Sequence, residues 1–164
     1  YRGLLGRTEM GRAFLSQPTS HSCPVDTVIL SAPANTAPTR AEIGKPVKLS
    51  GPDTYALCAA GDPIEALIAS DLSSLTGATR GGKLLVGIVK KGIFKAKAGE
   101  VLAIGDYVVS DAVPALGTVL PENTAGENLL TVRKGTNTTP FQCRVVGFDG
   151  GTGALASTVV VEFV

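Results

Sequence analysis

Short apolar segments that end in glycine, proline or aspartate follow one another along most of the chain. The pattern is clearest in residues 81–112, where Leu84 to Val89 is a continuous apolar run and Gly92 to Ala98 alternates apolar residues with lysines. Tyr107 to Val109, which is aromatic and β-branched, follows a glycine turn. Such residues favour β-strands, and this stretch shows no helical period. It therefore predicts three strands joined by glycine turns.

The same pattern, followed from residue 41 onward, predicts nine strands. They are Pro46–Leu49, Thr54–Cys58, Ile64–Ser70, Leu84–Val89, Gly92–Ala98, Tyr107–Ser110, Leu129–Val132, Phe141–Phe148 and Thr158–Val164. Gly51-Pro52-Asp53 is expected to turn the chain, because proline fixes φ and aspartate bonds nearby backbone, and Asp149-Gly150-Gly151 is expected to join the last two strands. Strands this short and closely spaced favour an all-β fold, a compact small β-barrel or sandwich.

Residues 1–40 differ in composition from the rest. They hold four of the ten prolines but three of the twenty glycines, with many Ser, Thr and Ala. Such a segment buries little apolar surface, so we interpret it as an extended N-terminal arm containing one strand at Val28–Leu30. A partly ordered tail is the alternative, and composition leaves both open. Residues 41–164 are then the β-barrel-like domain, and two short helical candidates, Asp71–Thr79 and Ala112–Leu120, do not carry the fold.

Composition and charge narrow the class of protein. A chain of 164 residues is long enough for one domain with a core, which must consist of Val, Leu, Ile and Ala because aromatic residues make up 5% and Trp is absent. A net charge of +1 creates no field that attracts nucleic acid or an anionic membrane, and no apolar run reaches the length of a transmembrane helix. We also expect no secretory signal. The cysteines, Cys23, Cys58 and Cys143, lack metal-site spacing and suit free thiols in a reducing compartment, although a bridge between two of them stays open.

No cluster of residues predicts catalysis, a metal site or a cofactor site. The one histidine, His21, has Cys23 nearby in the arm but no third group to orient the pair. Carboxylates are scattered and mostly follow glycine, where Asp is common for backbone reasons: Asp62, Glu65, Asp106, Asp111, Glu122 and Glu127. Residues 147–153 look like a phosphate loop but lack its lysine and serine, and a strand rather than a helix follows. We therefore expect no enzyme.

Lys90, Lys91, Lys95 and Lys97 form the only dense basic group of the sequence. In a strand, Lys95 and Lys97 share one face while Phe94 and Ala96 take the other. The plain interpretation is a solvated face or an edge strand protected against aggregation. Docking on an acidic protein surface is the alternative, and poor aromatic interleaving speaks against nucleic acid.

The order of several short motifs points to a known family. The motifs are Gly87-Ile88-Val89, Gly92-Ile93-Phe94, Ala103-Ile104-Gly105-Asp106-Tyr107-Val108, Cys143-Arg144-Val145-Val146 and the closing Val-Val-Val-Glu-Phe-Val. This order resembles the small capsid decoration, or cement, proteins of tailed bacteriophages, in which a G-V-F strand, an A-I-x-x-G-D-x-V-Y turn and strand, and a final R-V hairpin recur in a compact β domain. The resemblance covers about residues 41–164. The chain departs from it by a longer arm and by extra loops near residues 71–80 and 112–128.

The resemblance implies a structural virion protein, made in the host cytoplasm, that binds the outer surface of a phage capsid. Such proteins commonly sit as trimers at three-fold or quasi-three-fold positions and clamp adjacent subunits of the major capsid protein. The implied partners are the major capsid protein and further copies in a homotrimer, with no nucleic acid, no membrane and no cofactor. We expect contacts from arm residues that mix apolar side chains with arginine, from a β-augmenting strand and from the lysine group. They are Arg2, Leu4, Leu5, Arg7, Met10, Arg12, Phe14, Leu15, Val28, Ile29, Leu30, Lys90, Lys91, Lys95 and Lys97.

Two further hypotheses belong to other classes. One is a different virion β-module, such as part of a tail or fibre base. The other is an enzyme or small-ligand carrier in which Asp62, Asp106 and Asp111 line the mouth of a barrel.

Overall fold

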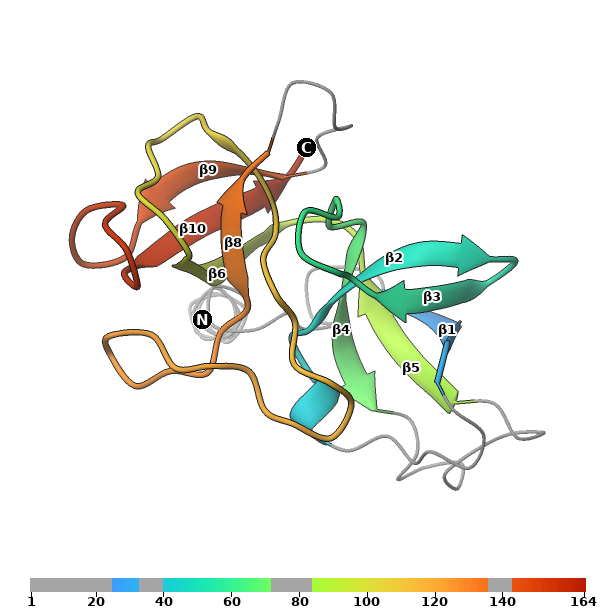
Figure 1. Cartoon of the computed structure of the whole chain (residues 1–164). Helices are drawn as coiled ribbons and strands as arrows, with labels where there is room; N and C mark the ends of the chain where they lie inside the picture. Colours follow the sequence, from blue (N-terminus) through green and yellow to red (C-terminus); the bar gives the residue numbers. More distant parts are fainter. Residues whose placement is uncertain (1–24, 33–39, 72–83, 136–142) are drawn as a thin grey trace, which may run out of the picture.

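The computed structural model describes residues 25–32, 40–71, 84–135 and 143–164, and within them it confirms the all-β prediction (Figure 1). The only helical element there is a short 3-10 turn, η1 (Arg40–Glu42). The strands are β1 (Asp26–Leu30), β2 (Pro46–Gly51), β3 (Thr54–Leu57), β4 (Ala66–Asp71), β5 (Leu84–Val89), β6 (Ile93–Ala98), β7 (Tyr107–Ser110), β8 (Thr131–Lys134), β9 (Cys143–Phe148) and β10 (Thr158–Phe163).

Each of the nine predicted strands overlaps one of β2 to β10, and the strand expected at Val28–Leu30 is the larger part of β1. Both predicted turns are present, since β2 and β3 pair as neighbours around Pro52-Asp53, and β9 and β10 pair around residues 149–157. Residues 112–120 form no helix. Of the other helical candidate, Asp71 ends β4 and the remaining residues lie outside the described ranges.

The strands form two closed barrels rather than the single barrel-like domain expected for residues 41–164. Around the first barrel the order is β1-β3-β2-β4-β5, and around the second it is β6-β8-β7-β9-β10. Figure 1 shows them as two lobes, with β1 to β5 in one and β6 to β10 in the other. β1 closes the first barrel by pairing with β3 and β5, so residues 26–30 belong to this barrel and not to an arm.

The two barrels repeat one topology. Reading β6 for β1, β7 for β2 and so on to β10 for β5 reproduces the strand order, and in each barrel the first strand runs parallel to the third. The hydrogen-bond registers also coincide, because Leu30 lies beside Tyr55 as Ala98 lies beside Val132. A single pairing scheme therefore describes both halves of the chain.

One bulge and one glycine turn also recur at equivalent places in the two barrels. An extra residue interrupts the pairing of β4 with β5 at Ala69, and another interrupts that of β9 with β10 at Val146. A turn precedes the second strand of each barrel, and its third residue is Gly44 (φ 89°) in one and Gly105 (φ 93°) in the other. Only glycine adopts this backbone without strain, which is why an Ile-Gly pair stands at both turns. Shared bulges and turns show that the chain is an internal structural repeat.

Alternation of small apolar and polar residues produces the core of each barrel. β6 alternates half-buried and buried residues, with Phe94, Ala96 and Ala98 inside. The first barrel encloses Leu30, Val47 and Val86 among others. The core of the second barrel also includes two residues of the first, Ile64 and Leu67, so the barrels share buried apolar surface. The arrangement of the two lobes is thus fixed by packing and not only by the short link at residues 90–92.

Candidate interaction surfaces

The segment of residues 111–130, between β7 and β8, belongs to the second barrel but packs along the first. Leu116 contacts the core of the first barrel, and Figure 1 shows this yellow to orange segment passing beside η1. Backbone bonds also join the two barrels, because the N–H of Gly61 donates to the carbonyl of Ser110 (2.8 Å) and the N–H of Ser110 donates to that of Asp62 (2.9 Å). The two barrels therefore act as one body at this contact.

A buried ion pair lies inside the same contact. Lys45 Nζ is 2.9 Å from Glu42 Oε1, and both side chains are at most 1% exposed. Both groups also bond the segment from the other barrel, since Lys45 donates to the carbonyl of Ala115 (2.9 Å) and Glu42 accepts from the N–H of Gly117 (2.7 Å). Charges removed from water need this full set of partners, so the pair ties the Ile43-Gly44 turn to residues 115–117.

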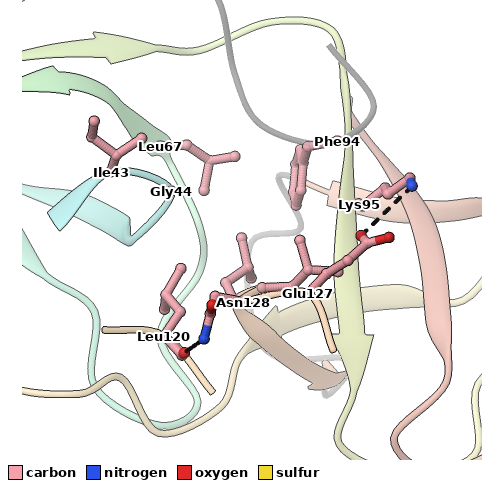
Figure 2. Close-up of a pocket in the computed structure, with 10 residues that line it drawn as sticks. Ile43, Gly44, Leu67, Phe94, Lys95, Leu120, Glu127 and Asn128 are labelled. Atoms are coloured by element: carbon pink, nitrogen blue, oxygen red, sulfur yellow. Dashed lines mark hydrogen bonds and ion pairs between the residues drawn. The ribbon is translucent and has the colours of Figure 1, made fainter. Parts of the chain in front are cut away.

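A cavity of about 300 Å³ lies between the barrels (Figure 2). Ile43, Gly44 and Leu67 of the first barrel form one wall. The second barrel contributes Phe94, Lys95, Leu120 and residues 127–130. Its lining is mostly apolar, with one polar corner where Lys95 meets Glu127. The cavity lies at the interface between the two barrels and not at the open end of either one.

The four predicted lysines occupy two places. Lys90 and Lys91 are exposed on the link between the barrels, and Lys90 pairs with Asp26 (3.7 Å). Lys95 lies on the outward face of β6, where Asp149 (2.7 Å) and Glu127 (3.6 Å) neutralise it, and its bond to Asp149 raises the pKa of its ammonium group. Lys97 shares that outward face, as the alternation predicted. The edge-strand interpretation is wrong, because β6 is paired on both sides, by β10 and β8.

The barrel leaves little free edge for the expected β-augmentation through Val28–Leu30. All of β1 pairs with β5 on one side, and Ile29 and Leu30 also pair with β3 on the other, so among the described residues the unpaired edge is confined to residues 26–28. Val28 and Leu30 are buried in the core, and Ile29 is partly exposed on the outer side. The arm positions from Arg2 to Leu15 lie outside the described residues.

The three aspartates of the ligand-carrier hypothesis each bond local backbone. Asp62 accepts from the N–H of Ala59 (2.7 Å), Asp106 from that of Ala103 (2.8 Å), and Asp111 from that of Ala112 (2.8 Å). Asp62 and Asp106 also pair with lysines. These are turn-stabilising roles, in agreement with the structural interpretation of the scattered carboxylates. Among the described residues no group of three or more His, Cys, Asp or Glu side chains has the arrangement of a metal site.

Cys58 and Cys143 are buried free thiols, as the spacing suggested. Burial raises the pKa of Cys58 to about 12 and also raises the pKa of Cys143. Their sulfur atoms lie near the carbonyls of Pro63 (3.5 Å) and Ile64 (3.7 Å), within the shared core. His21 and Cys23 lie outside the described ranges.

Exposed apolar side chains gather at one end of the second barrel. Val101, Ile104 and Leu155 are each more than 60% exposed, and a shallow apolar depression runs between residues 101–104 and 152–154. Sequence reasoning did not single out these residues. The available signal was the repeat of Ile-Gly-x-x-Val at residues 43–47 and 104–108. The first copy forms a half-buried turn between the barrels, and the second forms a turn that faces outward.

The chain matches no protein-family model, no curated protein and no solved structure. In the part of the chain that the structure describes, no helix is long and apolar enough to cross a membrane. The site must therefore be interpreted from its own geometry.

Proposed function

We propose that this protein is a structural virion component that binds the outer surface of a tailed-phage capsid and clamps adjacent major capsid subunits, as a homotrimer. The observation that carries the proposal is a double barrel in which Asp62, Asp106 and Asp111 bond the backbone of turns, joined to a long N-terminal segment rich in apolar residues and arginine. The motif resemblance to decoration proteins supports the same function.

The arm and the exposed lysines meet at one point of the molecule. The segment before residue 25 enters the first barrel at β1, where Asp26 lies beside Ile88 in the sheet and pairs with Lys90. Lys91 follows on the exposed link. An arm that binds neighbouring capsid subunits would therefore leave the protein next to two cations, which suits an acidic rim on the capsid.

Lys95 is only 16% exposed and lies against Asp149, whereas Lys90 and Lys91 are exposed and Lys97 is half-exposed. We therefore assign the basic contact to Lys90, Lys91 and Lys97 and the apolar contact to Leu4, Leu5, Phe14 and Leu15. In this arrangement the barrels form the folded body of the protein, while the arm extends to neighbouring capsid subunits. Ordering the arm costs free energy, which its added contact area offsets on binding.

Undecorated tailed-phage capsids mixed with the purified chain and imaged by cryo-electron microscopy test the proposal. We expect ordered density on the outer surface and a rise in the temperature at which the capsids break open. Replacing Leu4, Leu5, Phe14 and Leu15 together by serine should abolish that density while the circular dichroism spectrum stays the same. Wild-type protein that leaves the shell bare would overturn the capsid function.

A further inference from the structure

The contact between the two barrels joins two different faces, one from each barrel. Because the barrels are repeats, the equivalent of each face can be identified on the other barrel. The first half is the turn face of the first barrel, formed by Ile43, Gly44 and Leu67. It sits on the groove face of the second barrel, formed by Phe94, Lys95 and residues 129–130. Figure 2 shows Leu67 and Phe94 facing the same cavity from opposite barrels.

Because the barrels share one pairing scheme, each face has a counterpart that this contact leaves open. The counterpart of the turn face, on the second barrel, is Ile104, Gly105 and Arg144, with Ile104 63% exposed. The counterpart of the groove face, on the first barrel, is Asp26, Thr27 and residues 52–53, and an open groove of about 600 Å³ lies there. With respect to the described residues, one molecule thus carries an open turn face on the second barrel and an open groove face on the first.

The buried faces and their open counterparts differ in one consistent way: where a buried face has a pair of apolar residues, the open face has an ion pair. Leu67 and Val89, neighbours in the first barrel, correspond to Arg144 and Glu162, whose charged atoms are 3.0 Å apart. On the groove face, the tilted, contacting rings of Phe94 and Phe163 correspond to Asp26 and Lys90.

Each open face therefore presents one cation and one anion. If the open faces meet as the buried ones do, Arg144 of one copy takes the place of Leu67, and Asp26 of the next copy takes the place of Phe94, which lines the same cavity. Arg144 then faces an anion, which favours this register over a shifted one.

We propose that the open turn face of one copy binds the open groove face of a second copy, repeating between molecules the contact that joins the two barrels within one. The interface is head-to-tail: such contacts form a ring when the rotation from one copy to the next closes and a filament when it does not, and we propose the closed form. Each copy supplies two barrels, and three copies give a ring of six similarly arranged barrels. The proposal rests on the homotrimer of the proposed function, but not on binding to a capsid, which the imaging experiment tests separately.

Paired charge swaps in the full chain test the interface by sedimentation velocity over a concentration series. One variant combines Arg144→Glu with Glu162→Arg, and the other combines Asp26→Lys with Lys90→Asp. Each keeps an ion pair within its own barrel but inverts the polarity of one face. We expect each to raise the dissociation constant about tenfold or more, and the variant carrying all four substitutions to return to within about threefold of wild type.

An apolar pair of substitutions provides a matched control. Ile104→Asp should abolish association, whereas Val119→Asp, at an equally exposed residue away from both faces (61% against 63%), should not. A wild-type chain that stays monomeric at every concentration, a fourfold variant that is not rescued, or equal effects at positions 104 and 119 would each overturn the interface.

Discussion

Replacing Lys45 by methionine tests how the two barrels are held together. Methionine preserves most of the volume and removes the charge, so the Glu42 carboxylate, whose partners include the N–H of Gly117, loses its cation while being 1% exposed. An uncompensated buried carboxylate costs about 3–5 kcal/mol. For a chain of this length that loss lowers the melting temperature by roughly 6–20 °C, at about 2–4 °C per kcal/mol.

The exposed pair between Lys48 and Asp62 supplies the matched control. Its N–O distance of 2.7 Å is close to the 2.9 Å of the buried pair, but its side chains are 37% and 22% exposed. Lys48→Met should therefore cost less than about 1 kcal/mol. The contrast between the two substitutions isolates burial as the cause, because the chemical change is the same.

Urea unfolding followed by far-ultraviolet circular dichroism measures both variants, with tyrosine fluorescence as a second probe because the chain has no Trp. The double variant Glu42→Leu/Lys45→Met should be clearly more stable than Lys45→Met alone, since no buried charge remains; the freed Ala115 carbonyl and Gly117 N–H limit the recovery by about 1 kcal/mol each. If Lys45→Met costs no more than Lys48→Met, or if the double variant loses the sum of the single losses, the reasoning is wrong.

Three further predictions concern the packing and the titrating groups. Gly153→Ala places a Cβ 1.8 Å from the carbonyl oxygen of Leu102 and should destabilise the chain by at least about 1–3 kcal/mol in chemical denaturation, whereas Gly151→Ala meets nothing within 4 Å and should change little; equal effects would contradict the close approach. Burial raises the pKa of Cys58 to about 12 and also raises the pKa of Cys143, so both thiols should resist iodoacetamide at pH 8 in the folded chain and react fully in urea. Peptide mass spectrometry measures the labelling, and rapid labelling of either cysteine in the folded chain would refute their burial. Burial opposes ionisation of Asp62, but its bonds to Lys48 and to the N–H of Ala59 outweigh burial and lower the pKa of the carboxyl. This group therefore stabilises the fold above about pH 4, and the contribution disappears as the pH falls through the lowered pKa. Asp62→Asn should flatten the loss of stability below about pH 4, and an unchanged profile would contradict the assignment.

The strands were predictable because local signals determine them. β5 and β7 were predicted at their observed bounds, since apolar and β-branched runs ended by turn residues leave little choice. The pairing of β1 with β5 depends on contacts between distant segments, and residues 26–30 carry no local mark of membership in a barrel. For the same reason the division into two barrels could not be predicted from strand patterns alone.

The open faces were harder to predict than the strands. In β4, Ala66, Leu67 and Ile68 are all buried, because one side of the strand faces its own barrel and the other faces the second barrel. In β9 the equivalent positions alternate, with Arg144 outside between Cys143 and Val145. The continuous apolar run of β4 marks the covered face, and the alternating run of β9 marks the uncovered face. This difference can be recognised only after the two repeats have been aligned.

The reach of residues 111–130 across to the first barrel has a consequence for synthesis. Each barrel is continuous in sequence, so the first has all its strands as soon as β5 leaves the ribosome. Lys45 and Glu42 nevertheless receive their partners at Ala115 and Gly117 only after β6 and β7 have been made. Until then the charges of Lys45 and Glu42 can stay hydrated, and Leu67 and Ile64 lack the residues of the second core against which they pack. The first half of the chain is therefore completed by its second half, and co-translational folding should finish in one late step rather than barrel by barrel.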